Sequence, residues 1–368
     1  MSSSLEKKRN SSLPNDLLLS CFARVSRLYY PTLSLVSKRF RSLLASPELY
    51  KARSLLGHTE HCLYVCFASY PRSLWYTLCL KPNQTLTNDN SGYVLATVPI
   101  PRSPQSCFSG LVAVGSDIYN IQEITSNVSI LDCRTHTWRK APSLPVMLLS
   151  LSASVLDGKI YVAGTSFKDG ESYPDSLRNT VEVFDTKTQS WDAETIPCSE
   201  TICDFYGSRS ACIDGKFHVK AGKVVAYSSK ESRWDLSTPK MGDFFITDSY
   251  CVIENVLYSA SYGVLRWYDS KVRTWRHVKG GLPEFPCGAP IRLADYGGKM
   301  AVLWEVKIEN DLYDLGQGGC GYKKIWCAEI ALERLKIVGE IWGKVEWFDH
   351  VLTVPQSCHM VKVLAVTV

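Results

Sequence analysis

The chain carries two hydrophobic patterns, one after the other. Between residues 13 and 55 apolar side chains recur every three or four positions, which is the period of an amphipathic helix. From about residue 60 this period disappears, and short apolar or alternating runs bounded by turn residues predict β-strands instead. The sequence therefore predicts a small helical front end followed by a large all-β body.

Three short helices are predicted in the front end. Pro14 and Asp16 suit the first turn of one helix, and Ser46-Pro47-Glu48 supplies a capping hydroxyl, a proline and an early acid for the last. Leu13, Leu17, Leu18 and Phe22 hold more apolar surface than two neighbouring short helices can hide from water, which predicts a helical, partly hydrophobic docking surface. Each predicted helix has one apolar face. These faces are Leu17, Leu18, Cys21, Phe22 and Val25; then Leu33, Val36, Phe40, Leu43 and Leu44; and finally Leu49 and Leu55.

A unit of fixed order recurs in the body. An apolar strand reaches a tight turn such as Asp157-Gly158, a second strand has an aromatic residue near its start, and a third strand ends in a polar turn and a tryptophan. The tryptophans recur roughly every 40 to 55 residues, which is typical of four-stranded propeller blades. We interpret them as packing elements between blades. The aromatic residues are Tyr119, Tyr161, Phe217 and Tyr258, and the tryptophans are Trp138, Trp191, Trp234 and Trp275.

Both ends of the body supply further strands. Leu63–Ala68 and Leu74–Leu80 are predicted to belong to a first blade, and Tyr296–Trp304 and Ile325–Ile330 to a last one. The final run, Val361–Val368, is predicted to pair back onto the first or last blade and close the ring. We therefore expect a mainly β protein with a propeller of about six blades.

Charge and composition narrow the class of protein. Of the 368 residues 45% are apolar and 21% charged, which excludes wholesale disorder. Residues 1–53 hold ten basic and three acidic side chains, so their net charge is +7. The rest of the chain has a net charge of −2, which gives +5 for the whole chain. These basic residues are scattered over all the predicted helices, whereas a DNA-binding module gathers them on one helix or arm. We expect no nucleic-acid partner.

No apolar stretch is long enough to span a bilayer, and the first twelve residues lack the apolar core of a secretory signal. We therefore expect no membrane partner and a cytoplasmic and/or nuclear location. In such a reducing compartment the 14 cysteines are expected to be free thiols.

Candidate chemical sites are few. His58, His61, Cys62 and Cys66 are close in sequence, but zinc sites usually come as two spaced pairs. The glycine-rich segment 316–321 lacks the Lys-Ser/Thr of a phosphate loop. The seven histidines fall at unrelated positions of the repeat, and no acid–base pair recurs. We predict no metal, no cofactor and no catalytic residue, which makes a propeller enzyme the weakest functional alternative.

The front end, residues 9–55, resembles an F-box. The resemblance rests on Leu13-Pro14-Asn15-Asp16-Leu17-Leu18, followed at the right distance by Leu33-Ser-Leu35-Val36-Ser37-Lys38-Arg39-Phe40-Arg41-Ser-Leu43. F-box proteins bind the Skp adaptor of cullin–RING ubiquitin ligases through this module. Cys21 stands where a larger aliphatic residue is common, and Phe40 where tryptophan is common. The resemblance implies that the adaptor contact is formed or supported by Leu13, Pro14, Leu17, Leu18, Cys21, Phe22, Leu33, Val36, Lys38, Phe40 and Leu43. A cap that packs only on the β body is the alternative interpretation.

The body, residues 56–368, is similar to kelch repeats, most clearly over residues 150–200 with their Ile-Tyr-Val-Ala-Gly, Val-Glu-Val-Phe-Asp and Thr-x-x-Trp runs. The two resemblances imply the plant-type substrate-recognition subunit of an SCF (Skp–cullin–F-box) ubiquitin ligase. Residues 1–8 would be a flexible tail, the F-box would hold the Skp-family adaptor and through it a cullin, and the propeller would recruit a target for ubiquitination. The target and its binding residues are unknown, and the insertions 167–177 and 307–322 are the candidate loops. A kelch scaffold acting outside a ubiquitin ligase is the main alternative.

Overall fold

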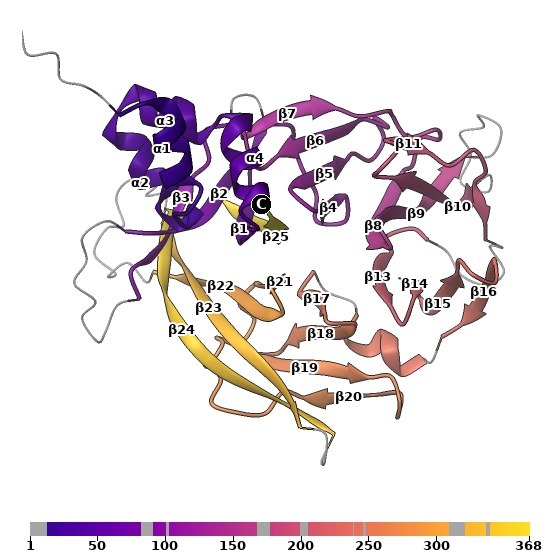
Figure 1. Cartoon of the computed structure of the whole chain (residues 1–368). Coiled ribbons are helices and arrows are strands. Elements are labelled where there is room, and N and C mark those ends of the chain that lie inside the picture. Colours follow the sequence, from indigo (N-terminus) through magenta and orange to yellow (C-terminus); the bar gives the residue numbers. More distant parts are fainter. Residues whose placement is uncertain are drawn as a thin grey trace, which may run out of the picture.

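The chain forms a ring of six β-sheets, with a group of helices against one part of the ring (Figure 1). A computed structural model describes residues 13–81, 91–100, 103–167, 177–198, 205–237, 239–245, 248–308, 321–335 and 339–368. Each sheet is a blade of antiparallel strands, and the six blades surround a central channel. The predicted β-propeller preceded by helices is therefore confirmed, with six blades.

The helices form one group, which we call the helical module (residues 13–55). Its elements are α1 (Asn15–Phe22), the 3-10 helix η1 (Arg27–Tyr29), α2 (Tyr30–Val36), α3 (Lys38–Leu44) and α4 (Pro47–Leu55). The prediction of a single second helix is wrong. Ser37 is extended (φ −162°, ψ 160°), and its hydroxyl accepts a hydrogen bond from Phe40 N, so it ends α2 and caps α3. Apolar spacing alone does not distinguish a capping serine from one inside a helix.

The blades are lettered A to F, with strands given from the channel outward. Blade A is β25 (His359–Thr367), β1 (His61–Ser69), β2 (Arg72–Leu80) and β3 (Tyr93–Thr97); blade B is β4 (Leu111–Val114), β5 (Asp117–Ile121), β6 (Val128–Asp132) and β7 (Thr137–Lys140). Blade C is β8 (Ser150–Leu156), β9 (Lys159–Phe167), β10 (Leu177–Asp185) and β11 (Ser190–Trp191), with β12 (Ile196–Pro197) also paired to β10.

Blade D is β13 (Arg209–Ile213), β14 (Lys216–Ala221), β15 (Lys223–Ser228) and β16 (Arg233–Leu236), and the 3-10 helix η3 (Pro239–Phe244) follows it. Blade E is β17 (Tyr250–Ile253), β18 (Val256–Ser261), β19 (Val264–Asp269) and β20 (Thr274–His277). Blade F is β21 (Ile291–Tyr296), β22 (Lys299–Lys307), β23 (Tyr322–Leu335) and β24 (Glu340–Pro355).

Neighbouring innermost strands run in the same direction. Lys362, early in β25, donates to Phe108 O and Leu111 O at the start of β4, while Thr367 N at the end of β25 donates to Gly115 O at the end of β4. The helical module lies where the inner strands end, because α4 faces Ser116 and Thr367 across a cleft. We call the opposite face of the ring, where the inner strands begin, the distal face.

The ring closes through its C-terminal strand, as predicted. β25 pairs antiparallel with β1 in a register that places Val363 opposite Val65 and Leu364 opposite Tyr64. Successive side chains of β25 point to opposite faces of the sheet. Val363 accordingly joins the hydrophobic cluster shared with blade F, whereas Leu364 joins the cluster shared with blade B and the helices. One strand thus seals the contact between blade A and each of its neighbours.

The repeated tryptophans pack between blades, as predicted. The indole N–H of Trp191 donates to Pro142 O, that of Trp234 to Pro197 O, and that of Trp275 to Lys240 O, with lengths of 3.0, 2.9 and 2.8 Å. Each acceptor belongs to the segment that leaves the preceding blade. Trp138 instead packs edge-on against Trp75 of blade A, with 6.1 Å between ring centroids.

Blade F carries a long outer hairpin, β23–β24, that reaches both neighbouring blades (Figure 1). Trp347 stacks on Tyr93 of blade A at 4.2 Å, and Lys279, just beyond blade E, exchanges backbone hydrogen bonds with Ile341 and Gly343. A Cβ at Gly280 (φ 108°) would collide with the backbone oxygen of Gly343, so the close approach of these two segments requires glycine at position 280. The sequence predicted only Ile325–Ile330 of this hairpin.

Two further observations concern the class of protein. In the described part of the chain, no helix is long and apolar enough to cross a membrane. The described cysteines are all free thiols. Cys66 and Cys327 are fully buried, and burial raises the pKa of the Cys66 thiol to about 12, as expected for cysteines that act as small core residues.

Deleting residues 360–368 is expected to unfold the ring. The deletion removes Met360, Val363, Leu364, Val366 and Val368, which are all buried. At roughly 1.5–3 kcal/mol for each side chain, the loss approaches the whole stability of an ordinary domain, about 5–15 kcal/mol. Thermal unfolding followed by circular dichroism measures the effect, and Val361→Thr, at a half-buried position of the same strand, is the control. An unchanged melting temperature after the deletion would contradict closure by β25.

Candidate functional site

The first helix exposes one apolar stripe and buries another. Leu13, Leu17 and Cys21 follow one another at i, i+4 and i+8 and all face solvent, with Leu13 57% and Leu17 54% exposed. Leu18 and Phe22 lie on the other side and are buried in the cluster that joins the module to blades A and B. The module is therefore fully packed while part of its apolar surface stays outside.

The corner between α2 and α3 extends this exposed surface. Leu35 is 76% and Val36 63% exposed. Arg39, one turn further along, donates from Nε to Asn15 Oδ1 at 2.9 Å and from Nη2 to Leu13 O, so the corner is fastened beside the start of α1. The exposed residues thus form one surface, which we call the docking patch: Leu13, Pro14, Leu17, Cys21, Leu35, Val36 and Lys38.

The predicted adaptor residues divide into two groups. Exposed are Leu13, Pro14, Leu17, Cys21, Val36 and Lys38, whereas Leu18, Phe22 and Leu43 are buried and Leu33 and Phe40 half-buried in the module. The second group supports the first: the Phe22 and Phe40 rings meet edge to face at 4.9 Å and hold α1 against α3. Leu35 was missed because its outward position follows from the helix break at Ser37, which the sequence analysis did not predict.

Two buried arginines fix the helical module to the ring. Arg27 donates from Nη2 to Cys133 O of blade B at 2.8 Å, and its backbone N–H donates to Glu60 Oε2 at 2.8 Å. Arg53, 2% exposed, donates to Val25 O and Tyr30 Oη and lies 3.2 Å from Glu60 Oε1. Glu60 is thus the carboxylate that both arginine segments share, at the point where the helices give way to β1.

Aromatic groups complete this junction. The Arg27 guanidinium lies 5.4 Å from the Tyr50 ring centroid, and burial raises the pKa of the Tyr50 hydroxyl to about 12. Tyr64 Oη donates to Cys133 O at 3.0 Å and lies 2.8 Å from His136 Nε2. Burial and the nearby Arg27 charge lower the pKa of His136 to about 3, so this ring is neutral at physiological pH.

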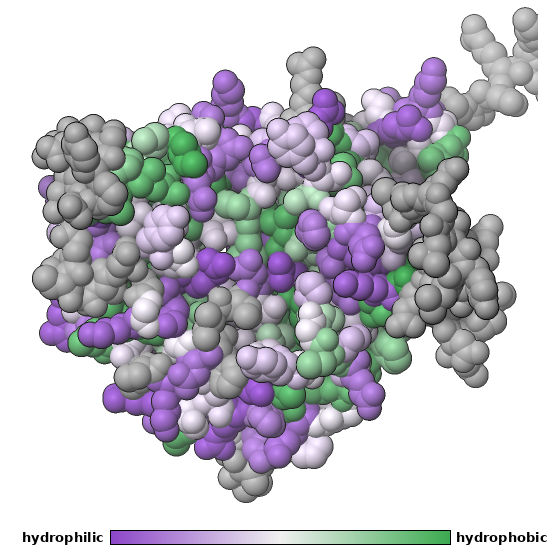
Figure 2. Space-filling view, turned by 180° about the vertical axis from the view of Figure 1, so that it is seen from behind, coloured by the Kyte–Doolittle hydropathy of each residue, from purple (hydrophilic) through white to green (hydrophobic). Residues whose placement is uncertain are grey.

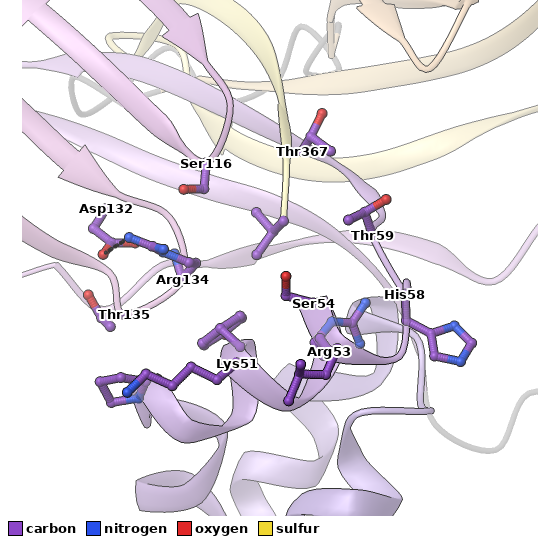
Figure 3. Close-up of a pocket in the computed structure, with 14 residues that line it drawn as sticks. Lys51, Arg53, Ser54, His58, Thr59, Ser116, Asp132, Arg134, Thr135 and Thr367 are labelled. Carbon is purple, nitrogen blue, oxygen red and sulfur yellow. Dashed lines mark hydrogen bonds and ion pairs between the residues drawn. The ribbon is translucent and has the colours of Figure 1, made fainter. Parts of the chain in front are cut away.

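A cleft of about 740 Å³ opens between α4 and blade B. Figure 3 shows Lys51, Arg53 and Ser54 on the helix side and Ser116, Asp132 and Arg134 on the blade side, with His58 pointing away. Asp132 is already paired with Arg134 at 2.9 Å. The rest of the lining combines hydroxyl, cationic and apolar side chains.

The other segments that the sequence analysis singled out do not belong to the docking patch. Cys62 and Cys66 are buried in β1, and in the described residues no group of three His, Cys, Asp or Glu side chains is placed to hold a metal ion. Residues 316–320 and the tail, residues 1–8, lie outside the described residues, as does most of the insertions 167–177 and 307–322. Phe167 and Lys307 end second strands, which places the beginnings of both insertions on the distal face.

The back of the molecule, as seen in Figure 1, is a mixed surface. Figure 2 shows hydrophobic and hydrophilic residues interspersed over this view, with hydrophobic groups both near the middle and toward the edges. A surface of this kind offers both apolar and charged contacts to a partner.

Known protein families match both parts of the chain. The family described as "F-box domain" matches residues 10–52, and the family described as "FKB95, Kelch-repeats domain" matches residues 75–352. In Arabidopsis thaliana, the F-box/kelch-repeat protein At5g51250 is 61% identical over 370 residues, covering 96% of this chain and 99% of that protein. The F-box/kelch-repeat protein At3g06570 is 53% identical, with coverages of 97% and 93%, and At4g39550 is 49% identical, with 98% and 94%.

Removal of the shared carboxylate is expected to loosen the junction. Glu60→Gln leaves the buried Arg53 without its counter-charge and weakens the hydrogen bond that the Arg27 backbone N–H donates, and it should lower the free energy of unfolding by about 2–3 kcal/mol. This is below the usual range for a broken buried pair because Glu60 is 30% exposed. Urea denaturation measures the change, and Glu48→Gln, at an exposed site of α4, is the matched control. Equal stabilities of the two variants would show that Glu60 does not hold the junction.

His136 is expected to make the fold sensitive to acid. Its folded pKa lies far below the ordinary value of 6.5, so between pH 6.5 and about 3 the unfolded chain binds a proton that the folded chain does not. Stability is then lost as the pH falls below 6.5, by up to about 1.4 kcal/mol per pH unit. His136→Asn tolerates the left-handed backbone at φ 56° and should flatten this dependence between pH 7 and 5. Parallel curves for variant and wild type, from urea denaturation at each pH, would refute the assignment.

Proposed function

This chain belongs to the F-box/kelch-repeat family, and we propose that it is the substrate-recognition subunit of an SCF-type ubiquitin ligase. In this role the helical module binds a Skp-family adaptor, which is held by a cullin, and the propeller recruits a target protein for ubiquitination. The observation that carries the proposal is the docking patch, a set of exposed and mainly apolar side chains on a module whose other face is packed in the shared core.

The energetics of the docking patch favour a permanent partner. Leu13, Leu17, Leu35 and Val36 are each more than half exposed. Burying such side chains completely is worth roughly 1.5–3 kcal/mol each, and contiguous exposed apolar patches usually mark protein interfaces. Lys38 and the nearby Arg39 add positive charge at the edge of the patch, so an adaptor surface with apolar pockets and acidic flanks would be complementary to it.

The proposed mechanism is tethering. The ligase transfers ubiquitin from a conjugating enzyme, and this chain raises the concentration of target lysines near that enzyme without performing chemistry itself. We therefore propose a non-catalytic adaptor role. The buried Arg27–Cys133 and Arg53–Glu60 contacts support it, because a module that is fixed to the ring holds a bound target in one orientation. The place of action that fits this role is the cytoplasm, the nucleus or both.

Capture of the adaptor tests the proposal. Leu13→Ala combined with Pro14→Ala removes side chains from the docking patch and is expected to weaken capture of a purified Skp-family adaptor by about 30-fold or more, as for hot-spot residues. The propeller should keep its melting temperature because both residues are exposed. Affinity is measured by pull-down and by surface plasmon resonance.

The matched control is Leu55→Ala. Leu55 is 88% exposed in the same module but lines the cleft at the ring and lies outside the docking patch. It should bind the adaptor like the wild type. If the double variant also binds like the wild type, the module serves another partner, and a kelch scaffold outside a ubiquitin ligase becomes the better description.

A further inference from the structure

Three cations from three blades meet at the distal mouth of the channel. Arg209 begins β13, Arg292 is the second residue of β21, and Lys362 lies early in β25. Their charges act on one another and on Asp248, which lies just before β17. Asp248 is paired with Arg209 at 2.7 Å, so one of the three cations has a carboxylate partner.

The hydrogen-bond partners of the other two cations are neutral, and the carboxylates whose charges reach them, Asp248 and Glu305, are already paired with Arg209 and Lys323. Lys362 Nζ donates to Phe108 O at 3.0 Å and Leu111 O at 2.7 Å, and Arg292 donates to Val361 O and Ile291 O. In the described part of the chain neither forms an ion pair. An ammonium group has three donors and a guanidinium five, so both retain unused N–H groups.

Burial makes this arrangement costly without an anion. It lowers the pKa of Lys362 to about 8 and lowers the pKa of Arg292 as well, because both charges are partly removed from water. A carboxylate brought to the mouth would form charge-assisted hydrogen bonds and restore the balance of charge.

There is room for such a group beside both cations. The channel contains a cavity of about 480 Å³ that is lined by Lys362 and Phe108. A second cavity of about 520 Å³, between blades E and F, is lined by Arg292, Asp248 and Tyr262. Asp243 also lines this second cavity and is exposed, and its negative charge repels an anion. A bound carboxylate is therefore expected next to Arg292 and away from Asp243.

Large exposed side chains lie on the distal face, and one of them, Tyr262, lines the same cavity as Arg292. The turns between second and third strands lie on the distal face, and they carry Tyr70 in blade A, Ile124 in blade B and Tyr262 in blade E, with exposures of 90%, 62% and 82%. A small anion would use none of these side chains, whereas a peptide can contact them with one residue and the cations with the next.

We propose that the distal mouth binds an acidic peptide segment, whose carboxylates pair with Arg292 and Lys362 while an apolar side chain contacts Tyr262. The inference that this segment belongs to a ubiquitination target rests on the proposed function. The inference that the mouth binds an acidic peptide does not depend on the proposed function. The location agrees with that role, because the adaptor and the peptide then occupy different faces of one rigid ring.

The test uses the full chain and two fluorescent peptides, one with six glutamates flanked by tyrosine and leucine and one with glutamines in their place. Fluorescence anisotropy at physiological salt should show binding of the glutamate peptide and at least tenfold weaker binding of the glutamine peptide. Lys362→Met keeps the apolar stem of the side chain and should weaken the glutamate peptide about tenfold or more. Lys223→Met removes an exposed lysine from the distal turn of blade D and should leave binding unchanged.

Three results would overturn the proposal: equal affinity for the two peptides, equal weakening by both variants, or a Lys362→Met variant that binds like the wild type. The last would leave Lys362 as a structural link between blades A and B. If Lys362→Met fails to fold, acetylation of wild-type lysines by acetic anhydride replaces it, and the glutamate peptide should slow modification of Lys362 and not of Lys223. The Leu13→Ala, Pro14→Ala variant should bind the peptide normally, so failed adaptor capture and failed peptide binding are separate results.

Discussion

The pairing of β25 with β1 is the contact on which the rest of the molecule depends. It brings the last strand of the chain beside the first strand of the ring, and it ends at Glu60, whose backbone N–H and C=O both pair with Val368. The carboxylate of the same residue faces Arg27 and Arg53 of the helical module. Closure of the ring and attachment of the helices therefore share one residue, and a ring opened at β25 would also lose the support of its helices.

The consequence is that the helical module and the propeller are packed together as one rigid unit. The hydrophobic cluster around Leu18 and Phe22 continues without interruption into Tyr64, Trp75 and Leu364 of the propeller. Packed interiors resist small displacements, so the docking patch and the distal face are held at a fixed distance and angle. A receptor in a ligase needs this property, since a loosely attached recognition domain would sample many positions in which no target lysine meets the conjugating enzyme.

Much of the fold could be predicted from the sequence because the repeat is encoded locally. Each of blades B to E has its own turn signal and its own tryptophan, and Trp191, Trp234 and Trp275 use the same indole hydrogen bond to the preceding blade. What could not be predicted depends on single positions or on distant partners. The break at Ser37 moves Leu35 outward, and the hairpin β23–β24 is extended by contacts with Lys279 and Tyr93. The module and the propeller boundaries at residues 55 and 56 stay a prediction, and the shared core crosses them.

Net charge was the least informative property, and the structure explains why. The front end carries a net charge of +7, but several of its cations have structural contacts. Arg27 and Arg53 are buried between the helical module and the ring, and Arg39 connects α3 to α1. The body sums to −2, yet three of its cations are concentrated at one mouth of the channel, because the ring brings together the starts of strands that are far apart in sequence. Net charge does not record where the charged residues lie, whereas the closed ring determines which charged residues lie close together. The cations proposed to bind an acidic peptide therefore lie in the part of the chain whose net charge is −2.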